Sequence, residues 1–161
     1  GGECHRVTER RGMALPDEAA TLELGRRLAA GVEPGASLHL HGDLGAGKTT
    51  LVRGLLRGLG FEGRVKSPVF ARVELYDLSK LSLYHFDFYR FDQPAEFRDS
   101  GLSEHFGTEA VCVVEWPRKA GDFLPLSDLD IHLQAGGSGG RDALFEAHTP
   151  RGQRWLNAAC A

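Results

Sequence analysis

The apolar positions of the chain repeat with two periods, and their alternation predicts an α/β domain. One segment with helical spacing begins at Pro16-Asp17-Glu18 and ends at Gly31, and a second runs from Thr49 to Leu59 with Gly60 as a C-cap. The apolar stripes consist of Ala19, Leu22, Leu24, Leu28 and Ala29 in the first and of Leu51, Leu55, Leu56 and Leu59 in the second. We therefore expect two amphipathic helices that pack on a sheet.

Strand-like patterns fill much of the remaining chain. Alternation or short apolar runs predict strands at residues 37–41, 63–68, 70–76, 81–86, 110–116, 127–134 and 141–149. Segments 70–76 and 81–86 should form an antiparallel pair, because only a short polar connection separates them. Helical pieces are predicted at 94–97, 101–106 and 150–161. Residues 1–12 show no periodic pattern, so we expect poor order there.

A phosphate-binding loop lies between the first strand and the second long helix. Residues 42–50 read GDLGAGKTT, which matches the pattern G-x-x-x-x-G-K-[ST], and the flanking strand and helix are the context that this motif requires. Its glycines let backbone N–H groups curl around a phosphate, while Lys48 reaches the β- and γ-phosphates and the Thr49 hydroxyl binds Mg²⁺. The predicted nucleotide-binding residues are Asp43, Leu44, Gly45, Ala46, Gly47, Lys48, Thr49, Thr50 and Trp116.

The motif predicts one P-loop NTPase-like domain over residues 1–161. We expect a mixed sheet with parallel core strands, antiparallel additions and helices on both faces. The run Val111-Cys112-Val113-Val114-Glu115 is typical of a buried parallel strand that ends in a Walker B acid.

Two carboxylates stand at the ends of predicted strands, where α/β sheets bind ligands. Glu115 could hold Mg²⁺ with Thr49 or orient the attacking water, and Asp87 is a second candidate. A turn or cap residue is the structural alternative for Asp87, as core packing is for Trp116. We predict Lys48, Asp87 and Glu115 as the catalytic residues, without a sequence criterion for which carboxylate orients water.

Composition argues against several kinds of protein but does not by itself indicate a function. The net charge of -3 gives no global reason for nucleic-acid or membrane binding. The three cysteines form no C-x-x-C pair, which argues against a disulfide framework or zinc site and favours a reducing compartment. We find no long apolar run and no signal-peptide pattern, so we expect a cytoplasmic protein. The histidines show no metal-ligand spacing and are expected to be structural or exposed.

The motifs together resemble the TsaE (YjeE) family, the bacterial P-loop ATPases of tRNA threonylcarbamoyladenosine synthesis. The resemblance covers residues 13–134 in order and spacing. It rests on five segments: Leu15-Pro16-Asp17-Glu18 with the helix after it, the phosphate-binding loop, Val65-Lys66-Ser67-Pro68, Tyr84-His85-Phe86-Asp87-Phe88-Tyr89-Arg90, and Glu115-Trp116-Pro117.

The resemblance implies a slow, Mg²⁺-dependent ATPase that acts with TsaB and TsaD, the proteins that modify adenosine 37 of tRNA. The chain would then meet tRNA only indirectly, through that complex. By matching position, Ser67 would lie in a switch-like segment, Asp87 would be a catalytic carboxylate, and Trp116 would lie near the nucleotide. No arginine finger is evident in the chain, so a partner could supply one.

Val69 departs from the family pattern, which usually has Thr after Ser-Pro, and Arg118 departs where an acid or amide is usual. Because Val69 has no hydroxyl, we predict weak intrinsic turnover with nucleotide binding retained. Steady-state ATP hydrolysis by a Val69→Thr variant should exceed that of the parent chain. Turnover no faster than the parent's would count against this role.

Three alternatives to the ATPase follow from the residues. A small-molecule kinase would need a basic lid, for which the short stretch after Glu115 offers only Arg118 and Lys119. A GTPase would need an N-K-x-D motif, which the sequence lacks. A non-hydrolysing, nucleotide-gated scaffold is favoured by Val69.

Overall fold

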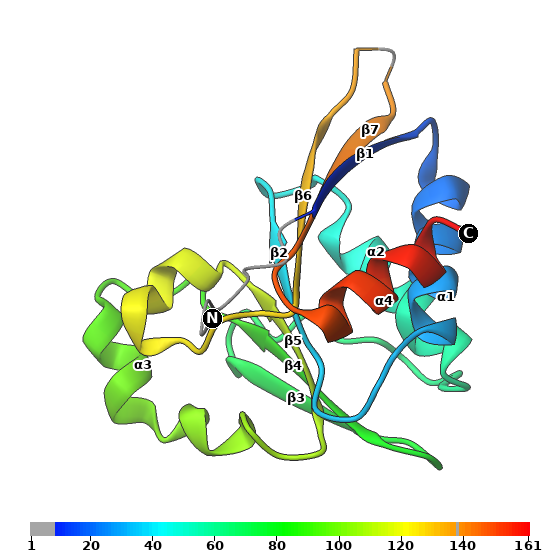
Figure 1. The fold of residues 1–161 in the computed structure, drawn as a ribbon. Coiled ribbons are helices and arrows are strands. Elements are labelled where there is room, and N and C mark those ends of the chain that lie inside the picture. The colour runs from blue at the N-terminus through cyan, green and yellow to red at the C-terminus, as the bar shows by residue number, and fades with distance from the viewer. Residues whose placement is uncertain (1–8, 138) are drawn as a thin grey trace, which may run out of the picture.

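Seven strands form one mixed sheet in this computed structural model, which describes residues 9–137 and 139–161 (Figure 1). The order across the sheet is β1-β7-β6-β2-β5-β4-β3. The strands are β1 (Glu9–Leu15), β2 (Ser37–His41), β3 (Val73–Asp77), β4 (Ser82–Asp87), β5 (Val111–Glu115), β6 (Leu129–Ala135) and β7 (Arg141–Ala147). Strand β2 pairs in parallel with β5 and β6, and β4 in parallel with β5, while the outer pairs are antiparallel. The expected parallel core with antiparallel additions is confirmed.

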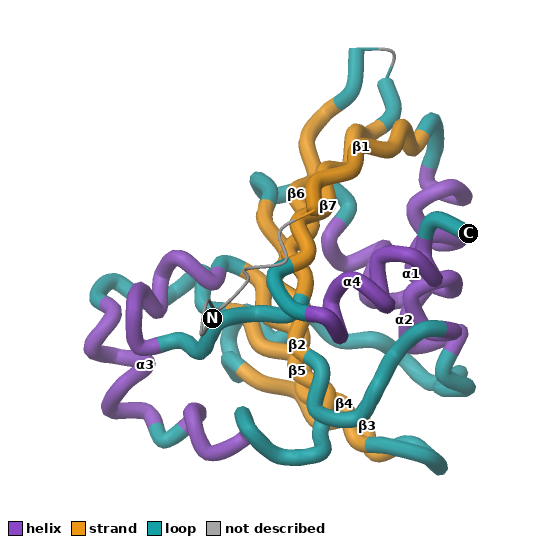
Figure 2. Tube along the Cα trace, in the orientation of Figure 1, coloured by secondary structure: helices purple, strands orange, loops and turns teal. Residues whose placement is uncertain are grey.

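Helices lie on both faces of the sheet, as expected (Figures 1 and 2). One face is covered by α1 (Glu18–Ala30), α2 (Lys48–Gly58) and α4 (Pro150–Ala159), and the other carries α3 (Pro94–Ser100) with the 3-10 segments η1 (Leu102–His105) and η2 (Pro117–Phe123). Asp17 caps α1 by accepting a hydrogen bond from Ala20 N. Trp155 of α4 donates its indole N–H to Leu28 O over 2.8 Å, which ties α4 to α1.

Alternate residues of the central strands point into two separate apolar clusters. Leu38, Leu40 and Val113 pack beneath α1 and α2. Phe86 and Val114 point to the other face, into an aromatic cluster with Phe88, Phe91 and Phe97. Because strand side chains alternate between faces, Glu115 of β5 and its neighbour Asp87 of β4 lie on the same face as Val113, toward α2. The side chains at the ends of both strands therefore point toward the phosphate-binding loop.

The structure differs from the sequence-based expectations in three places: at residues 9–12, at residues 63–68 and at the start of β3. Residues 9–12 belong to β1, although no pattern predicted a strand there, and residues 1–8 lie outside the described residues. No strand forms at 63–68: Lys66 N donates to the Tyr76 hydroxyl instead of to a neighbouring strand. Strand β3 begins only at Val73, since Arg72 adopts a φ of 69° and its N–H closes a turn onto Pro68 O.

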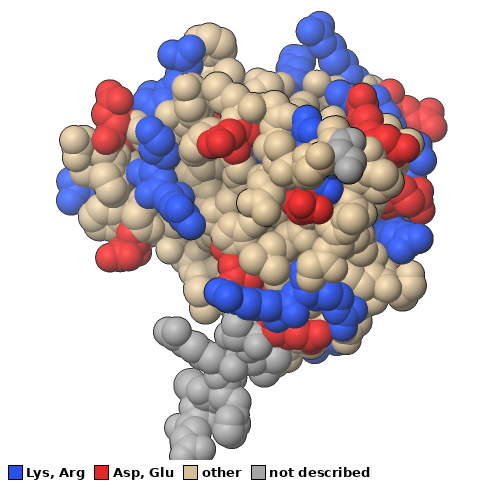
Figure 3. Space-filling view, turned by 90° about the horizontal axis from the view of Figure 1, so that it is seen from above, with Lys and Arg blue, Asp and Glu red and all other residues tan. Residues whose placement is uncertain are grey.

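Charged side chains of both signs lie on the surface, and two of the three cysteines lie within the described residues. Basic and acidic side chains are interspersed on the face shown in Figure 3. Cys112 and Cys160 are free thiols, and burial raises the pKa of Cys112 to about 12. Within the described residues, none of the helices combines the length and apolar character needed to span a bilayer.

Candidate functional site

The phosphate-binding loop has the backbone that its glycines permit. Gly42, Gly45 and Gly47 have φ values of 148°, 80° and 101°, a region that residues with a Cβ rarely adopt. Gly47 is the N-cap of α2 and has no side chain to cap it, so N–H groups of the first helical turn remain available to a ligand. The helix dipole adds positive potential at the same point. The loop is therefore shaped for an anion.

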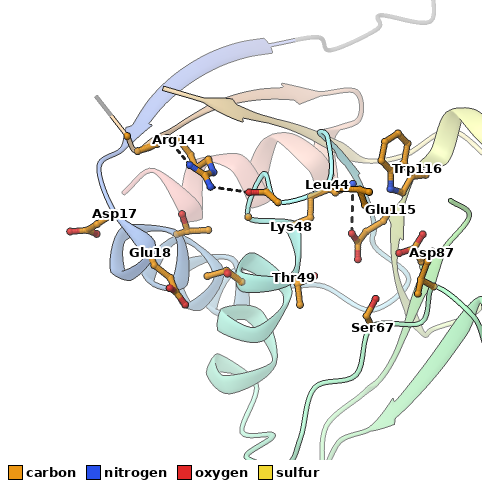
Figure 4. Close-up of a pocket in the computed structure, with 17 residues that line it drawn as sticks. Asp17, Glu18, Leu44, Lys48, Thr49, Ser67, Asp87, Glu115, Trp116 and Arg141 are labelled. Carbon is orange, nitrogen blue, oxygen red and sulfur yellow. Dashed lines mark hydrogen bonds and ion pairs between the residues drawn. The ribbon is translucent and has the colours of Figure 1, made fainter. Parts of the chain in front are cut away.

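A cleft of about 490 Å³ opens beside this loop (Figure 4). It contains most of the residues predicted from sequence: Leu44, Gly45, Gly47, Lys48, Thr49, Thr50, Ser67, Asp87, Glu115 and Trp116. Val69 also lines it, so the departure from the family pattern falls inside the site. Asp43 and Ala46 line instead a second cleft on the other side of the loop, which Trp116 also borders.

The parallel register of β4 and β5 places the two predicted carboxylates directly opposite each other, at Asp87 and Glu115. Both are buried, with exposed fractions of 5% and 4%. Glu115 Oε2 lies 2.6 Å from His85 Nε2, and Glu115 Oε1 lies 3.9 Å from Lys48 Nζ. Asp87 Oδ1 accepts a hydrogen bond from Tyr89 N over 2.9 Å. Asp87 therefore caps a turn, as the structural alternative held, and also faces the cleft.

Lys48 is a buried cation without a hydrogen-bonded partner among the described residues. Its side chain is 5% exposed, and Nζ lies 4.1 Å from the centroid of the Trp116 ring. Burial lowers the pKa of Lys48, although Glu115, Asp87 and Asp43 oppose this shift. An ammonium group held this way lacks acceptors, and phosphate oxygens would supply them.

The donor set of the cleft suits Mg²⁺. The Thr49 hydroxyl and the Asp87 and Glu115 carboxylates offer hard oxygen ligands and line the same cavity. Burial raises the pKa of Asp87, a shift that its hydrogen bond from Tyr89 N opposes and the nearby Glu115 reinforces. Nearby positive charge, such as a metal ion, would favour the ionised form of Asp87.

Among the residues that sequence reasoning missed, His85 and Arg141 make side-chain contacts to the site. His85 holds Glu115 and occupies the same face of β4 as Asp87, two positions away, so strand alternation could have indicated it. Arg141 of β7 donates from Nη2 to Gly45 O over 2.9 Å and from Nε to Ala46 O over 3.1 Å (Figure 4). No sequence signal joins Arg141 to a loop 95 residues earlier in the chain.

Comparison with known proteins identifies the family. The family model described as "Threonylcarbamoyl adenosine biosynthesis protein TsaE" matches residues 15–143. The TsaE protein of Haemophilus influenzae is 40% identical over 124 residues, covering 74% of this chain and 78% of that protein. TsaE of Bacillus subtilis is 40% identical over 132 residues, covering 82% of this chain and 81% of the relative.

A solved structure agrees with the sequence comparison. The crystal structure of Bacillus subtilis YdiB superimposes with a TM-score of 0.81 at 32% identity, and 96% of each chain is covered. The family match contains the phosphate-binding loop, both carboxylates and Arg141. The chain therefore belongs to the TsaE family.

Proposed function

We propose that this chain binds ATP with Mg²⁺ in the cleft of the phosphate-binding loop, hydrolyses it slowly, and serves tRNA threonylcarbamoyladenosine biosynthesis. The family description and the names of the relatives support the pathway. The observation that carries the nucleotide site is Lys48, whose buried Nζ lacks a hydrogen-bond acceptor among the described residues and lies at the start of α2.

The chemistry proposed is phosphoryl transfer to water, in which the protein positions groups and stabilises charge. Loop N–H groups and Lys48 would hold the β- and γ-phosphates, and Thr49 with Glu115 would hold Mg²⁺. A bound Mg²⁺ supplies charge neutralisation on the phosphate oxygens. Asp87 is the better placed of the two acids to orient water. Its Oδ1 is held by Tyr89 N, whereas Glu115 has His85 on one oxygen and Lys48 near the other.

Partners are part of the proposal. Slow turnover suits a switch whose nucleotide state is read by other proteins, here TsaB and TsaD, with tRNA reached only through them. Leu44 is 68% exposed and lines the cleft, and Phe70, next to Val69, is 75% exposed. Apolar side chains exposed beside a site are suited to contact a partner. The free thiols of Cys112 and Cys160 support a reducing compartment such as the cytoplasm.

One alternative retains support from a specific observation. Val69 lines the cleft without the hydroxyl that the family pattern usually supplies, which favours a scaffold that binds ATP and barely hydrolyses it. A small-molecule kinase is less well supported, since the residues after Glu115 form a short 3-10 segment rather than a helical lid.

The deciding measurement is ATP hydrolysis with Mg²⁺, by the chain alone and with purified TsaB–TsaD. We expect slow turnover alone and a rise on adding the complex, because partner contacts would order the switch-like segment around Ser67 and Val69. ATP binding without hydrolysis in either condition would leave the scaffold. If the complex neither binds the chain nor changes its turnover, the proposed role in tRNA modification is wrong.

A further inference from the structure

A second cluster of polar side chains lies on the sheet face opposite α1 and α2. His39 and His41 of β2 stand in register with Asp130 and His132 of β6, so four side chains that can bind metal lie side by side on two neighbouring strands. Residues two apart on a strand share a face, and adjacent strands are about 4.8 Å apart. The spacing rules used on the sequence could not find this group, because the register of β2 and β6 creates it.

The donor atoms of three of these residues already lie close together. The ligand atoms of His41, Asp130 and His132 are within 4.8 Å of one another. His41 Nε2 is 2.7 Å from Asp130 Oδ2, and the His41 and His132 rings stack with centroids 4.2 Å apart. All three side chains are partly buried. Because the stacked rings are nearly parallel, with an interplanar angle of 11°, a shared ion requires the rings to rotate until their in-plane Nε2 lone pairs converge.

Further donors surround this group. His148 Nε2 lies 3.4 Å from Asp130 Oδ1, and Glu146 Oε1 lies 2.7 Å from His132 Nε2. His39 borders the same small cavity of about 220 Å³ as His41, Asp130 and His148. The His39 side chain is only 8% exposed, and its Nε2 has no hydrogen-bond partner among the described residues. The cluster thus holds an unused nitrogen as well as carboxylates that lie within hydrogen-bond distance of the Nε2 atoms of His41 and His132.

We propose that His41, Asp130 and His132 form a binding site for one divalent transition-metal ion of the zinc class, with Glu146 or His148 available as a fourth ligand. Two imidazole nitrogens with a carboxylate are a donor set that Zn²⁺ favours in four-coordinate sites. Mg²⁺ prefers an all-oxygen environment, so the ion proposed here is distinct from the Mg²⁺ proposed for the nucleotide. Binding requires neutral imidazoles with the proton on Nδ1.

The position of the site links it to the nucleotide loop. His41 immediately precedes Gly42, the first residue of that loop, and His41 and His132 border the cleft that also contains Asp43 and Ala46. An ion on His41 and His132 would cross-link β2 to β6 at the point where the loop leaves the sheet.

The test uses the full chain without a polyhistidine tag and without nucleotide. Co²⁺ is the spectroscopic probe, and Zn²⁺ is then titrated by calorimetry. We expect one ion per chain, the visible absorption of four- or five-coordinate Co²⁺, and displacement by Zn²⁺. A His132→Gln variant should bind Zn²⁺ about tenfold or more weakly, and Asp130→Asn should do the same. His132 is 29% exposed, so its replacement should leave folding intact even if Asp130→Asn does not.

A His105→Gln variant is the matched control. His105 stacks on Tyr84, away from the cluster, and its loss should leave the affinity unchanged. The proposal is wrong if the parent chain does not bind Zn²⁺ at micromolar concentration, or if His132→Gln binds it as tightly as the parent. It is also wrong if Co²⁺ gives an intense near-ultraviolet thiolate band, which would place the ion on a cysteine.

Discussion

Replacing Lys48 by alanine is expected to abolish measurable ATP hydrolysis. Lys48 is buried in the cleft, and its Nζ has no hydrogen-bond acceptor among the described residues. Loss of one preorganised donor to developing charge costs on the order of 10²–10³ in kcat. A charge-assisted hydrogen bond contributes about 1.5–3 kcal/mol, so nucleotide affinity should fall by roughly 10- to 150-fold as well. Turnover assays and calorimetric titration with ATP measure the two effects.

Arg26→Ala is the charge-matched control for this variant. Arg26 is an exposed cation of α1 that lies 3.9 Å from Glu23, outside the cleft. Its removal should change neither turnover nor affinity. Thermal unfolding of both variants checks that each remains folded. A folded Lys48→Ala chain that hydrolyses ATP at the parental rate would contradict the assignment of this cleft as the nucleotide site.

Replacing Asp87 by asparagine should lower kcat while leaving ATP affinity close to that of the parent. Asp87 is proposed to orient the attacking water, and a positioned acid–base group contributes about 10²–10⁴-fold in rate. Asparagine keeps the acceptor for Tyr89 N, so the local turn should survive. Glu115→Gln should act differently. It weakens the proposed Mg²⁺ site and the contact with His85, so the Mg²⁺ concentration needed for turnover should rise.

The pH dependence separates these roles further. Burial raises the pKa of Asp87, so this acid takes up a proton at a higher pH than an ordinary aspartate does. If the ionised form is active, kcat/KM, which reports on the free protein, should fall on acidification from an unusually high pH, and Asp87→Asn should lose that limb. A raised folded-state pKa also means that ionisation of Asp87 costs stability as pH rises through that value. The Asn variant should therefore melt no lower than the parent at neutral pH.

The outcome that would reverse the assignment is specific. The water-orienting role would pass to Glu115 if two results occurred together. Asp87→Asn would have the parental kcat, and Glu115→Gln would lose most of its kcat with no change in Mg²⁺ dependence. Sequence reasoning left this choice open, and the contacts of the two carboxylates are what favour Asp87.

The residues that line the cleft beside the phosphate-binding loop were largely predictable, because the sequence signals that point to them are local. The loop pattern needs only eight consecutive residues and two flanking elements, and the apolar run before Glu115 indicates a buried strand without reference to any distant residue. The helix over residues 49–59 was predicted within one residue of α2, although the C-cap is Leu59 rather than Gly60. Apolar periodicity fixes such elements since each must bury its own stripe.

The other parts of the fold and of the site depend on strand pairings that no local sequence pattern indicates. Strand β1 is mostly polar or exposed and is held by its ladder to β7, so its sequence carries no alternation to detect. The group of His39, His41, Asp130 and His132 exists only because β2 and β6 pair in one register. The segment at 63–68 resembled a strand, but Pro68 cannot donate a backbone hydrogen bond and the chain turns there instead.

The contact between Arg141 and the phosphate-binding loop has a geometric consequence. The Ala46 carbonyl and the Gly47 N–H belong to one planar trans peptide, in which oxygen and hydrogen point in opposite directions. By holding the Ala46 oxygen, the guanidinium fixes the direction of the Gly47 N–H on the opposite side of the same peptide. Arg141 can thus orient a backbone donor of the loop to which it makes no direct hydrogen bond. The geometry of the loop therefore depends on β7, a strand that follows all the recognised motifs in the sequence.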